Sequence, residues 1–589
     1  MKRRKYSVPA VLLAFHFLLA ACPNGGGENE PVTPPEETIP PELTLEDQKS
    51  AGELAALFDA SGGFPAELSN SWKIWGHRNP LYTQAFGADP NALVYGDRVY
   101  LYMSNDTLEY TSGGQLNPNA SYGLGIQGIR MASSADLANW TDHGAVNIVG
   151  PANTNPLVED WTPLVSIEGV DRSWAPSAAW KMINGRPKFF MYWGNGGNGI
   201  GVVSADSPTG PWASPLDRLL VDRSTPNCAD VHYLFDPSVL VDNDNQGYLY
   251  FGGGDQFTPP FNNNNTGHAR RVKLSYNMIG LEGVPEYWLV PYLFEASDMK
   301  KINGYYYFSY STLNNVAGNT FGLLGTQIAY MMSPESPLGP FTDPKGILVR
   351  QLASADTNVH GAMFEFKGKT YYTYHAQKAA EAMGVTRMRS PHIDSMPVNS
   401  DGSIPPITMT RKGVEQAGYL NPYAVNEAET IGIQGGIYTR PAADAGNGML
   451  VTSIDTGDWL AVYGVDFGGE GASKFTARVR TPAAADYSGA IELRLDPEGA
   501  GETGDTGNLT PANTARITGG EVIGRVWIKA KPGESGKYGT VTADLDRAVT
   551  GVHDLVFVFY TSTGVNPETI VPDSRHKDCF EFDQWQFIH

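Results

Sequence analysis

Five stretches of the chain share one pattern of apolar and polar positions: an apolar segment, a polar turn, and then a segment crowded with Tyr and Phe. They begin at Ala92, Ala178, Ser238, Ala296 and Ala362. Alternation of this kind around a turn containing Gly or Asp is typical of a β-hairpin. Because a single hairpin cannot bury its apolar face, the repeat predicts stacked sheets, as in the blades of a β-propeller. We count five blades.

A second repeat supports this interpretation. The sequences SADSPTGPWASP from Ser204 and SPESPLGPFTDP from Ser333 resemble one outer element of two blades. We expect the propeller to span residues 72–416, with residues 399–414 closing the last blade. Beyond it, shorter alternating segments such as KFTARVRT and HDLVFVFY predict a β-sandwich of the jelly-roll type over residues 420–589. The predicted fold class is therefore all-β.

The N-terminus has the composition of an export signal. Basic residues at positions 2–5 precede an apolar run at 8–21 that is too short to span a membrane. The run ends in Leu-Ala-Ala-Cys, which resembles a bacterial lipobox and predicts lipidation of Cys22. An ordinary cleavage site with a chance cysteine is the alternative. We expect a signal peptide at 1–22 and a tether with an N-terminal extension at 23–71, in a cell-surface, periplasmic or secreted protein.

Charge and cysteine content narrow the classes of partner. The formal net charge is −21, from 63 acidic and 42 basic residues, which argues against nucleic acid and anionic membrane surfaces. A neutral substrate fits this charge, and a lipid anchor is the only membrane association that we expect. Besides Cys22 the chain has only Cys228 and Cys579, in different predicted domains, so a disulfide framework is excluded. We expect a monomer.

Three carboxylates precede predicted hairpins: Asp89, Asp236 and Glu295. The innermost strand of each propeller blade begins at one end of the central funnel, so these side chains are expected to enter one pocket. Hydrolysis of a glycosidic bond needs a protonated carboxyl as acid and an ionised carboxylate as base. A third carboxylate can keep the acid protonated by repulsion between like charges. The alternative is that the Asp-Pro pairs open turns and Glu295 is a strand-end charge.

These residues stand within a series of motifs, given in chain order as Asn79-Pro80, Ala88-Asp89-Pro90, Trp174-Ala175-Pro176, Phe235-Asp236-Pro237 and Phe294-Glu295-Ala296. The series resembles glycoside hydrolase family 43, whose members have a five-bladed propeller and hydrolyse with inversion. The resemblance implies that Asp89 is the general base, Asp236 the pKa modulator and Glu295 the general acid. Inversion implies that the acid and base carboxyls are about 6.5–9.5 Å apart, with room for water.

The resemblance implies roles for further residues of the propeller. His360 matches a family histidine that faces a calcium or another ion at the propeller axis, whereas a lone buried histidine would satisfy itself with backbone groups. Arg389 matches an arginine near the pocket that could orient the sugar or the acid, the alternative being a surface ion pair. Trp174 and Phe294 are candidate pocket walls for the substrate. Trp193 fits the blade core better.

The C-terminal segments VNEAET, GDWLAVYGVDFG and FEFDQWQF resemble carbohydrate-binding module family 6. The resemblance implies that Glu427, Glu429 and Asp583 bind a structural calcium ion, with solvated charges as the alternative. The spacing Glu-Ala-Glu places the two glutamates on one face of a strand.

The C-terminal domain departs from this family at two positions. Glu521 and Glu581 stand where many of these modules have an aromatic residue and an Asn. Sugar binding would then be lost, or moved to a sandwich face that carries Trp459 and Trp527. A purely structural domain is the alternative.

Within the hydrolase family, GADPNALVYGDRVYLYMSND, SWAPSAAW and LFDPSVLVDNDNQGYLYFGGG look most like arabinoxylan arabinofuranohydrolases. The resemblance implies an α-L-arabinofuranosidase that removes side chains from arabinoxylan. A β-xylosidase, endo-xylanase or arabinanase on the same scaffold is the nearest alternative. A surface lipoprotein that binds glycans without hydrolysing them is the alternative from another class.

Overall fold

The computed structural model describes residues 68–69, 71–107, 126–150, 162–254, 268–350, 359–382, 387–442, 448–481, 487–497, 520–529, 536–563 and 580–589. The chain divides into two compact units, residues 1–42 and 43–589, and the described residues belong to the second. Strands dominate these ranges, as expected of an all-β chain. The single helix found in them is α2 (Lys378–Ala382), and no helix there is long and apolar enough to cross a membrane. Cys22 lies outside the described residues.

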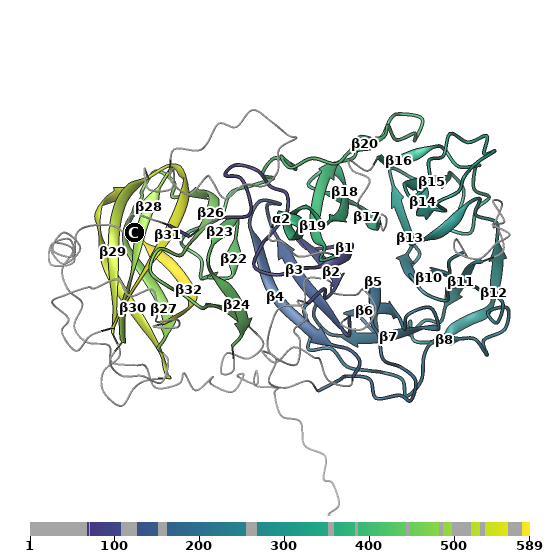
Figure 1. Ribbon diagram of the computed structural model, residues 1–589, viewed down its shortest axis with the longest axis horizontal. Helices are drawn as coiled ribbons and strands as arrows, with labels where there is room; N and C mark the ends of the chain where they lie inside the picture. Colours follow the sequence, from purple (N-terminus) through teal and green to yellow (C-terminus); the bar gives the residue numbers. More distant parts are fainter. Residues whose placement is uncertain are drawn as a thin grey trace, which may run out of the picture. The chain divides into compact units, whose positions relative to one another are not determined.

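The N-terminal two thirds form five sheets in chain order (Figure 1). The first contains β1 (Ala88–Tyr95), β2 (Arg98–Ser104), β3 (Gly128–Ser134) and β4 (Trp140–Asn147). The second contains β5 (Trp174–Ile183), β6 (Arg186–Gly194), β7 (Gly199–Ala205) and β8 (Val221–Asp222). The third contains β9 (Ser238–Val241), β10 (Gly247–Phe251), β11 (Ala269–Leu274) and β12 (Leu281–Trp288). The fourth contains β13 (Leu293–Ile302), β14 (Tyr305–Thr312), β15 (Ile328–Ser333), β16 (Ile347–Arg350) and β20 (Ile407–Thr408). The fifth contains β17 (Gly361–Phe366), β18 (Lys369–Ala376) and β19 (Ser390–Ser395).

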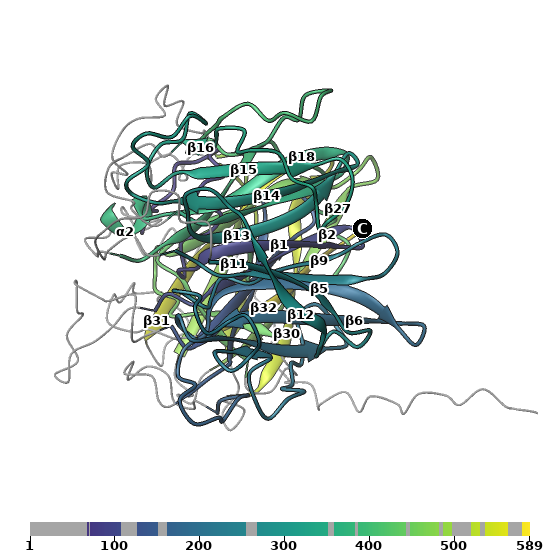
Figure 2. The ribbon, with the colours of Figure 1, turned by 90° about the vertical axis from the view of Figure 1, so that its right-hand side faces the viewer.

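The five predicted hairpins all form, as the first two strands of the five sheets. Their first strands pack in a cycle, β1 on β5, β5 on β9, β9 on β13, β13 on β17 and β17 on β1. In Figure 2 the strands β1, β5, β9 and β13 run across the view in similar directions. Apolar residues fill the layers between neighbouring sheets, for example Tyr192 and Leu249 between the second and the third.

Hydrogen bonds from backbone amides to side chains join successive inner strands. Asn91 Oδ1 accepts from the Ala178 amide at 3.0 Å, and Ser177 Oγ accepts from the Val239 amide at 3.0 Å. Ser238 Oγ then accepts from the Met299 amide at 2.7 Å, and Asp298 Oδ2 from the Met363 amide at 2.9 Å. The amide of Asp89 closes the series by donating to His375 Nδ1 at 2.9 Å. Each sheet is thus tied to the next beside the axis.

Two expectations about the outer parts of the sheets have different outcomes. The repeated segments after β7 and β15 form the same turn, in which Ser207 Oγ donates to Gly210 O and Ser336 Oγ donates to Gly339 O. Residues 399–414, however, do not close the last sheet. Their strand β20 pairs in parallel with β16 of the fourth sheet. The prediction was wrong because a two-residue strand carries no periodicity from which its partner can be read.

The C-terminal part consists of two antiparallel sheets that enclose one apolar core. One sheet contains β21 (Asn426–Glu427), β24 (Tyr438–Pro441), β25 (Met449–Thr452), β27 (Ala472–Arg480), β30 (Tyr538–Val549) and β32 (Glu581–Ile588). The other contains β23 (Ile433–Gly435), β26 (Trp459–Asp466), β28 (Tyr487–Leu495), β29 (Glu521–Lys529) and β31 (Val552–Thr563). Alternation along the strands sends residues such as Phe475 and Phe557 into the core. The arrangement is the predicted sandwich.

The sandwich is joined to the first sheet by strand pairing. Strand β22 (Thr430–Ile431) pairs antiparallel with β4, so the first sheet continues into the C-terminal part. The buried Asn139 reinforces this joint, because its Nδ2 donates to Tyr463 O and its Oδ1 accepts from the Tyr463 amide, both at 2.8 Å. Lys73 Nζ, also buried, donates to Leu81 O and Gly432 O.

Candidate active site

The inner strands of four sheets start with the same backbone irregularity. Asp89, Ala175, Asp236 and Ala296 have φ between +43° and +65°, a region that residues other than glycine seldom adopt. In the first, second and fourth sheets the register shifts at this point. An irregularity of this kind turns a side chain away from its normal alternation. Here the turned backbone directs Asp89, Asp236 and the neighbouring Glu295 toward the common axis.

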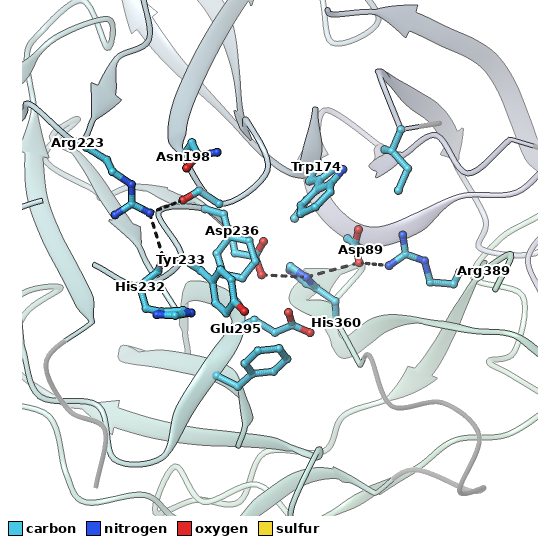
Figure 3. Close-up of a pocket in the computed structure, with 15 residues that line it drawn as sticks. Asp89, Trp174, Asn198, Arg223, His232, Tyr233, Asp236, Glu295, His360 and Arg389 are labelled. Atoms are coloured by element: carbon cyan, nitrogen blue, oxygen red, sulfur yellow. Dashed lines mark hydrogen bonds and ion pairs between the residues drawn. The ribbon is translucent and has the colours of Figure 1, made fainter. Parts of the chain in front are cut away.

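These three carboxylates line one pocket of about 480 Å³, a size typical of small-ligand sites. Figure 3 shows them with His360 between Asp236 and Asp89, and Arg389 on the other side of Asp89. The remaining lining residues are Ile126, Trp174, Ala175, Gly197, Asn198, Arg223, His232, Tyr233, Phe235 and Phe294. All seven residues predicted for the propeller site are therefore brought together.

Asp89 is buried, and both of its carboxylate oxygens have partners. Arg389 NH1 donates to Oδ1 at 2.9 Å, and Ser104 Oγ donates to Oδ2 at 2.6 Å. Ser104 Oγ also accepts from the Ala175 amide, which links the first two sheets. Burial acts to raise the pKa of Asp89, but the positive charge of Arg389 leads the opposing effects, and the pKa is lowered to about 2. His375 Nδ1 accepts from the Asp89 amide at 2.9 Å, and Arg389 is the main counter-charge. Asp89 is ionised at neutral pH.

Asp236 is buried on the opposite side of His360. Its Oδ2 accepts from the Ala296 amide at 2.7 Å. His360 Nδ1 lies 3.7 Å from Asp236 Oδ2 and 3.7 Å from Asp89 Oδ1. Burial raises the pKa of Asp236 to about 6, although His360 and the Ala296 amide favour the ionised form.

Glu295 has the opposite character to Asp89. Its carboxyl is buried, and Oε1 has no hydrogen-bond partner among the residues that the structure describes. Burial, followed by repulsion from Asp236 and Asp89, raises its pKa well above the usual value. The pocket therefore holds one carboxyl whose pKa is raised and one whose pKa is lowered, the pair that acid–base hydrolysis needs.

The other predicted residues of the propeller lie as follows. Arg389 lies in the pocket, as the family resemblance implied, and forms a buried ion pair with the predicted base rather than the alternative surface ion pair. Trp174 and Phe294 line the pocket. Trp193 is only 1% exposed and belongs to a blade core, as expected. The glycine after His360 follows from close packing, since a Cβ at Gly361 would lie 2.1 Å from Thr373 O.

Several residues of the site were missed by sequence reasoning. Ser104, Asp106 and His375 all stand where the second strand of a hairpin ends, and a polar residue closing an apolar strand is a signal that could have found them. Asn198, His232 and Tyr233 come from turns without a recognisable pattern. The side chain of Arg223 holds that wall by donating to the carbonyl oxygens of Gly197, Val231 and His232.

The predicted calcium ligands lie near one another in the sandwich. Strand β21, which carries Glu427, pairs with β32, which carries Asp583. Glu429 is buried, and its Oε2 has no hydrogen-bond partner within the described ranges. Burial followed by repulsion from Glu427 raises the pKa of Glu429 well above the usual value. Asp583 forms an ion pair with Arg478. In the described part of the chain no three His, Cys, Asp or Glu side chains are gathered as a metal site.

The sandwich face proposed for sugar binding is not accessible. Trp459 is fully buried and its Nε1 donates to Ser69 O, while Trp527 is 3% exposed. The expectation of a platform there is wrong, because both rings pack against neighbouring apolar side chains. The two departures from the module family make ion pairs instead. Glu521 binds Arg547 on the surface, and the buried Glu581 binds two arginines, Arg440 and Arg480.

Comparison with protein families gives two matches. Residues 77–404 match Glycosyl hydrolases family 43, and residues 427–588 match Carbohydrate binding module (family 6). The first match covers more than half of the chain and contains all the pocket residues. The second covers the strands of the sandwich and also β22, which pairs with the first sheet.

Relatives extend these matches over most of the chain. An arabinoxylan arabinofuranohydrolase of Paenibacillus polymyxa is 39% identical over 87% of this chain and 75% of its own length. A protein of the same name from Bacillus subtilis (strain 168) is 38% identical over 91% of this chain and 97% of its own. A crystal structure of a glycoside hydrolase family 43 arabinoxylan arabinofuranohydrolase from Bacillus subtilis, in complex with cellotetraose, superposes with a TM-score of 0.74 at 37% identity. The superposition covers 88% of this chain and 99% of that one.

Proposed function

Because this chain belongs to glycosyl hydrolases family 43, we propose that it removes L-arabinofuranosyl side chains from arabinoxylan by hydrolysis with inversion. Two relatives that carry the name arabinoxylan arabinofuranohydrolase align with most of the chain and support this substrate. The observation that carries the reaction is the placement of Glu295 and Asp89 in one pocket with pKa values shifted in opposite directions.

In the proposed reaction, Glu295 protonates the oxygen that links the arabinose to xylose. The bond from the arabinose C1 to that oxygen breaks while a water molecule attacks C1 from the opposite face. Asp89 takes the proton of that water, so arabinose is released with inverted configuration. This single displacement needs the two carboxyls to be about 6.5–9.5 Å apart.

Other pocket residues support these two. Asp236 keeps Glu295 protonated through repulsion, and Arg389 keeps Asp89 ionised. Trp174 and Phe294 offer aromatic surfaces to the C–H faces of a sugar.

The test compares Glu295→Gln with wild-type protein on two substrates. On arabinoxylan we expect release of free arabinose to fall by about 100- to 10,000-fold, the usual contribution of a general acid. On 4-nitrophenyl arabinofuranoside the loss should be much smaller, because nitrophenolate leaves without protonation. Equal losses on both would refute the role of Glu295. Xylose or xylo-oligosaccharides as products would refute the substrate, and absence of any product from wild-type protein would favour a glycan-binding protein.

We propose that the five sheets are the five blades of a propeller, on the support of the cyclic packing of their inner strands. The proposed domain limits remain 72–416 and 420–589. These limits divide the sequence, but the two domains share one sheet in the structure, because β22 pairs with β4.

We also propose a structural calcium ion held by Glu427, Glu429 and Asp583. Glu429 Oε2, which has no hydrogen-bond partner in the described part of the chain, and the mutual repulsion of the carboxylates support it, and oxygen donors are what Ca²⁺ prefers. The ion would offset that repulsion and join the two ends of the sandwich. Added CaCl₂ should raise the melting temperature of wild-type protein relative to EDTA and leave that of Glu429→Gln unchanged. No shift in wild-type protein would contradict the site.

Three further proposals remain. An ion at the propeller axis would lie beside His360, whose neighbours Asp89 and Asp236 offer oxygen donors.

The other two proposals concern the whole protein. The protein acts as a monomer. It is exported and anchored through Cys22, so metabolic labelling with palmitate should mark wild-type protein and not Cys22→Ser.

A further inference from the structure

Asp106 lies just beyond the end of β2, buried next to the pocket without lining it. Its carboxylate accepts three hydrogen bonds from Arg389. Nε donates to Oδ2 at 2.8 Å, NH2 donates to Oδ1 at 2.9 Å, and the backbone amide donates to Oδ2 at 3.1 Å. Burial acts to raise the pKa of Asp106. An acceptor of three N–H donors is nevertheless the ionised carboxylate at neutral pH.

Arg389 thus contacts two carboxylates in different ways. Two of its side-chain nitrogens form a fork with Asp106, the geometry that arginine favours for a carboxylate. Asp89 receives only NH1, on a single oxygen. The planar guanidinium cannot turn toward Asp89 while the fork holds.

The number of hydrogen bonds that Arg389 donates to Asp89 matters, because a general base must have a lone pair free to accept a proton. If the fork faced Asp89 instead, both of its oxygens would be occupied by arginine in addition to Ser104. With one donor on each oxygen, Asp89 keeps lone pairs with which it can accept a proton from water.

We propose that Asp106 is a positioning residue for Asp89, acting through Arg389. It holds the guanidinium so that only NH1 reaches Asp89. The inference rests on the proposed role of Asp89 as general base. An ion pair of purely structural value is the competing explanation, since breaking any buried pair destabilises a protein.

The main variant is Asp106→Asn, which keeps the size of the side chain and removes its charge. We expect kcat on arabinoxylan to fall by about 10- to 100-fold with KM within a factor of about two, because a misdirected base slows the chemical step and not binding. The matched control is Asp394→Asn, a buried carboxylate outside the pocket that is bonded to Tyr374 and Thr410. It should lower the melting temperature and leave kcat near the wild-type value.

A double-mutant cycle separates positioning from structure. In an Asp89→Ala background, Asp106→Asn should cause little further loss of kcat, because the base that Asp106 positions through Arg389 is already gone. The same fold loss in both backgrounds, or wild-type kcat in Asp106→Asn, would overturn the proposal. Wild-type activity in Asp89→Ala would instead refute the assigned base, and with it the proposed mechanism.

If Asp106→Asn does not fold, Arg389→Lys gives an independent test. Lysine keeps the positive charge but cannot form the fork. A fall in kcat with little change in KM is expected, and wild-type kcat would overturn the proposal.

Discussion

At the scale of single residues, the pocket separates the properties of three carboxylates by their surroundings. An arginine lowers the pKa of Asp89, while burial and a neighbouring charge raise the pKa of Glu295. Sequence reasoning could place these residues in one pocket, because each precedes a hairpin. It could not identify the partner of Asp106, since only the folded chain brings position 106 next to position 389.

The role of Asp236 leads to a prediction about pH. Glu295 must be protonated to act, so its pKa sets the alkaline limb of the activity profile. Because Asp236 raises that pKa by repulsion, Asp236→Asn should lower it and move the alkaline limb of kcat/KM to lower pH. The measurement is kcat/KM against pH. Asp242→Asn, a carboxylate paired with Lys301 outside the pocket, serves as control. A limb that stays in place or moves to higher pH would contradict the prediction.

At the scale of elements, the sheets share a second repeated feature in addition to the hairpin. The side chains that tie one inner strand to the next stand two residues after a left-handed backbone position: Asn91, Ser177, Ser238 and Asp298. The hairpins could be predicted because alternation and turns are local. This second repeat could not, because Asn, Ser and Asp share only an acceptor oxygen. The fifth sheet has Ala362 at that position, and the bond from Asp89 to His375 closes the cycle instead.

Ser238 tests the importance of these ties. Ser238→Ala would leave the buried Met299 amide without its acceptor, which should reduce the free energy of unfolding by about 1–3 kcal/mol. Because the bond joins the strand after Asp236 to the strand after Glu295, kcat should fall as well. Denaturant unfolding and steady-state kinetics measure the two effects. Ser224→Ala, at an exposed serine, should change neither, and unchanged stability in Ser238→Ala would rule out a structural role for the bond.

At the scale of the whole molecule, the order of propeller and sandwich could be predicted from the change in strand pattern after Leu420. Their junction could not. Strand β22 has two residues, and its partner β4 lies about 290 positions earlier, beyond the reach of any local pattern. The buried Trp459 and Trp527 were misjudged for the same reason, since the sequence gives no sign of what covers them.

Asn139 provides a test of the junction. Asn139→Ala removes both hydrogen bonds to the backbone of Tyr463 and leaves the buried Tyr463 amide without its acceptor, whereas Tyr463 O keeps the hydrogen bond from Gln416 Nε2. We expect the free energy of unfolding to fall by about 2–4 kcal/mol, and the whole chain to unfold in one step at lower temperature. Scanning calorimetry measures both. Asn243→Ala, at an exposed turn, should unfold like wild-type protein, and separate transitions for propeller and sandwich would argue against a rigid joint.

The left-handed backbone at Asp89 and Asp236 implies a conflict between catalytic activity and thermal stability. Aspartate pays a conformational cost at φ values of +52° and +47°, and asparagine tolerates that region at least as well. At Asp236 burial also disfavours the charge, since the folded pKa of about 6 exceeds the ordinary 3.8, so stability falls as pH rises between those values. Asp236→Asn should therefore melt at a higher temperature than wild-type protein at pH 7, and less so at pH 4. Selection for thermal stability alone would therefore favour the replacement of these catalytic-site aspartates.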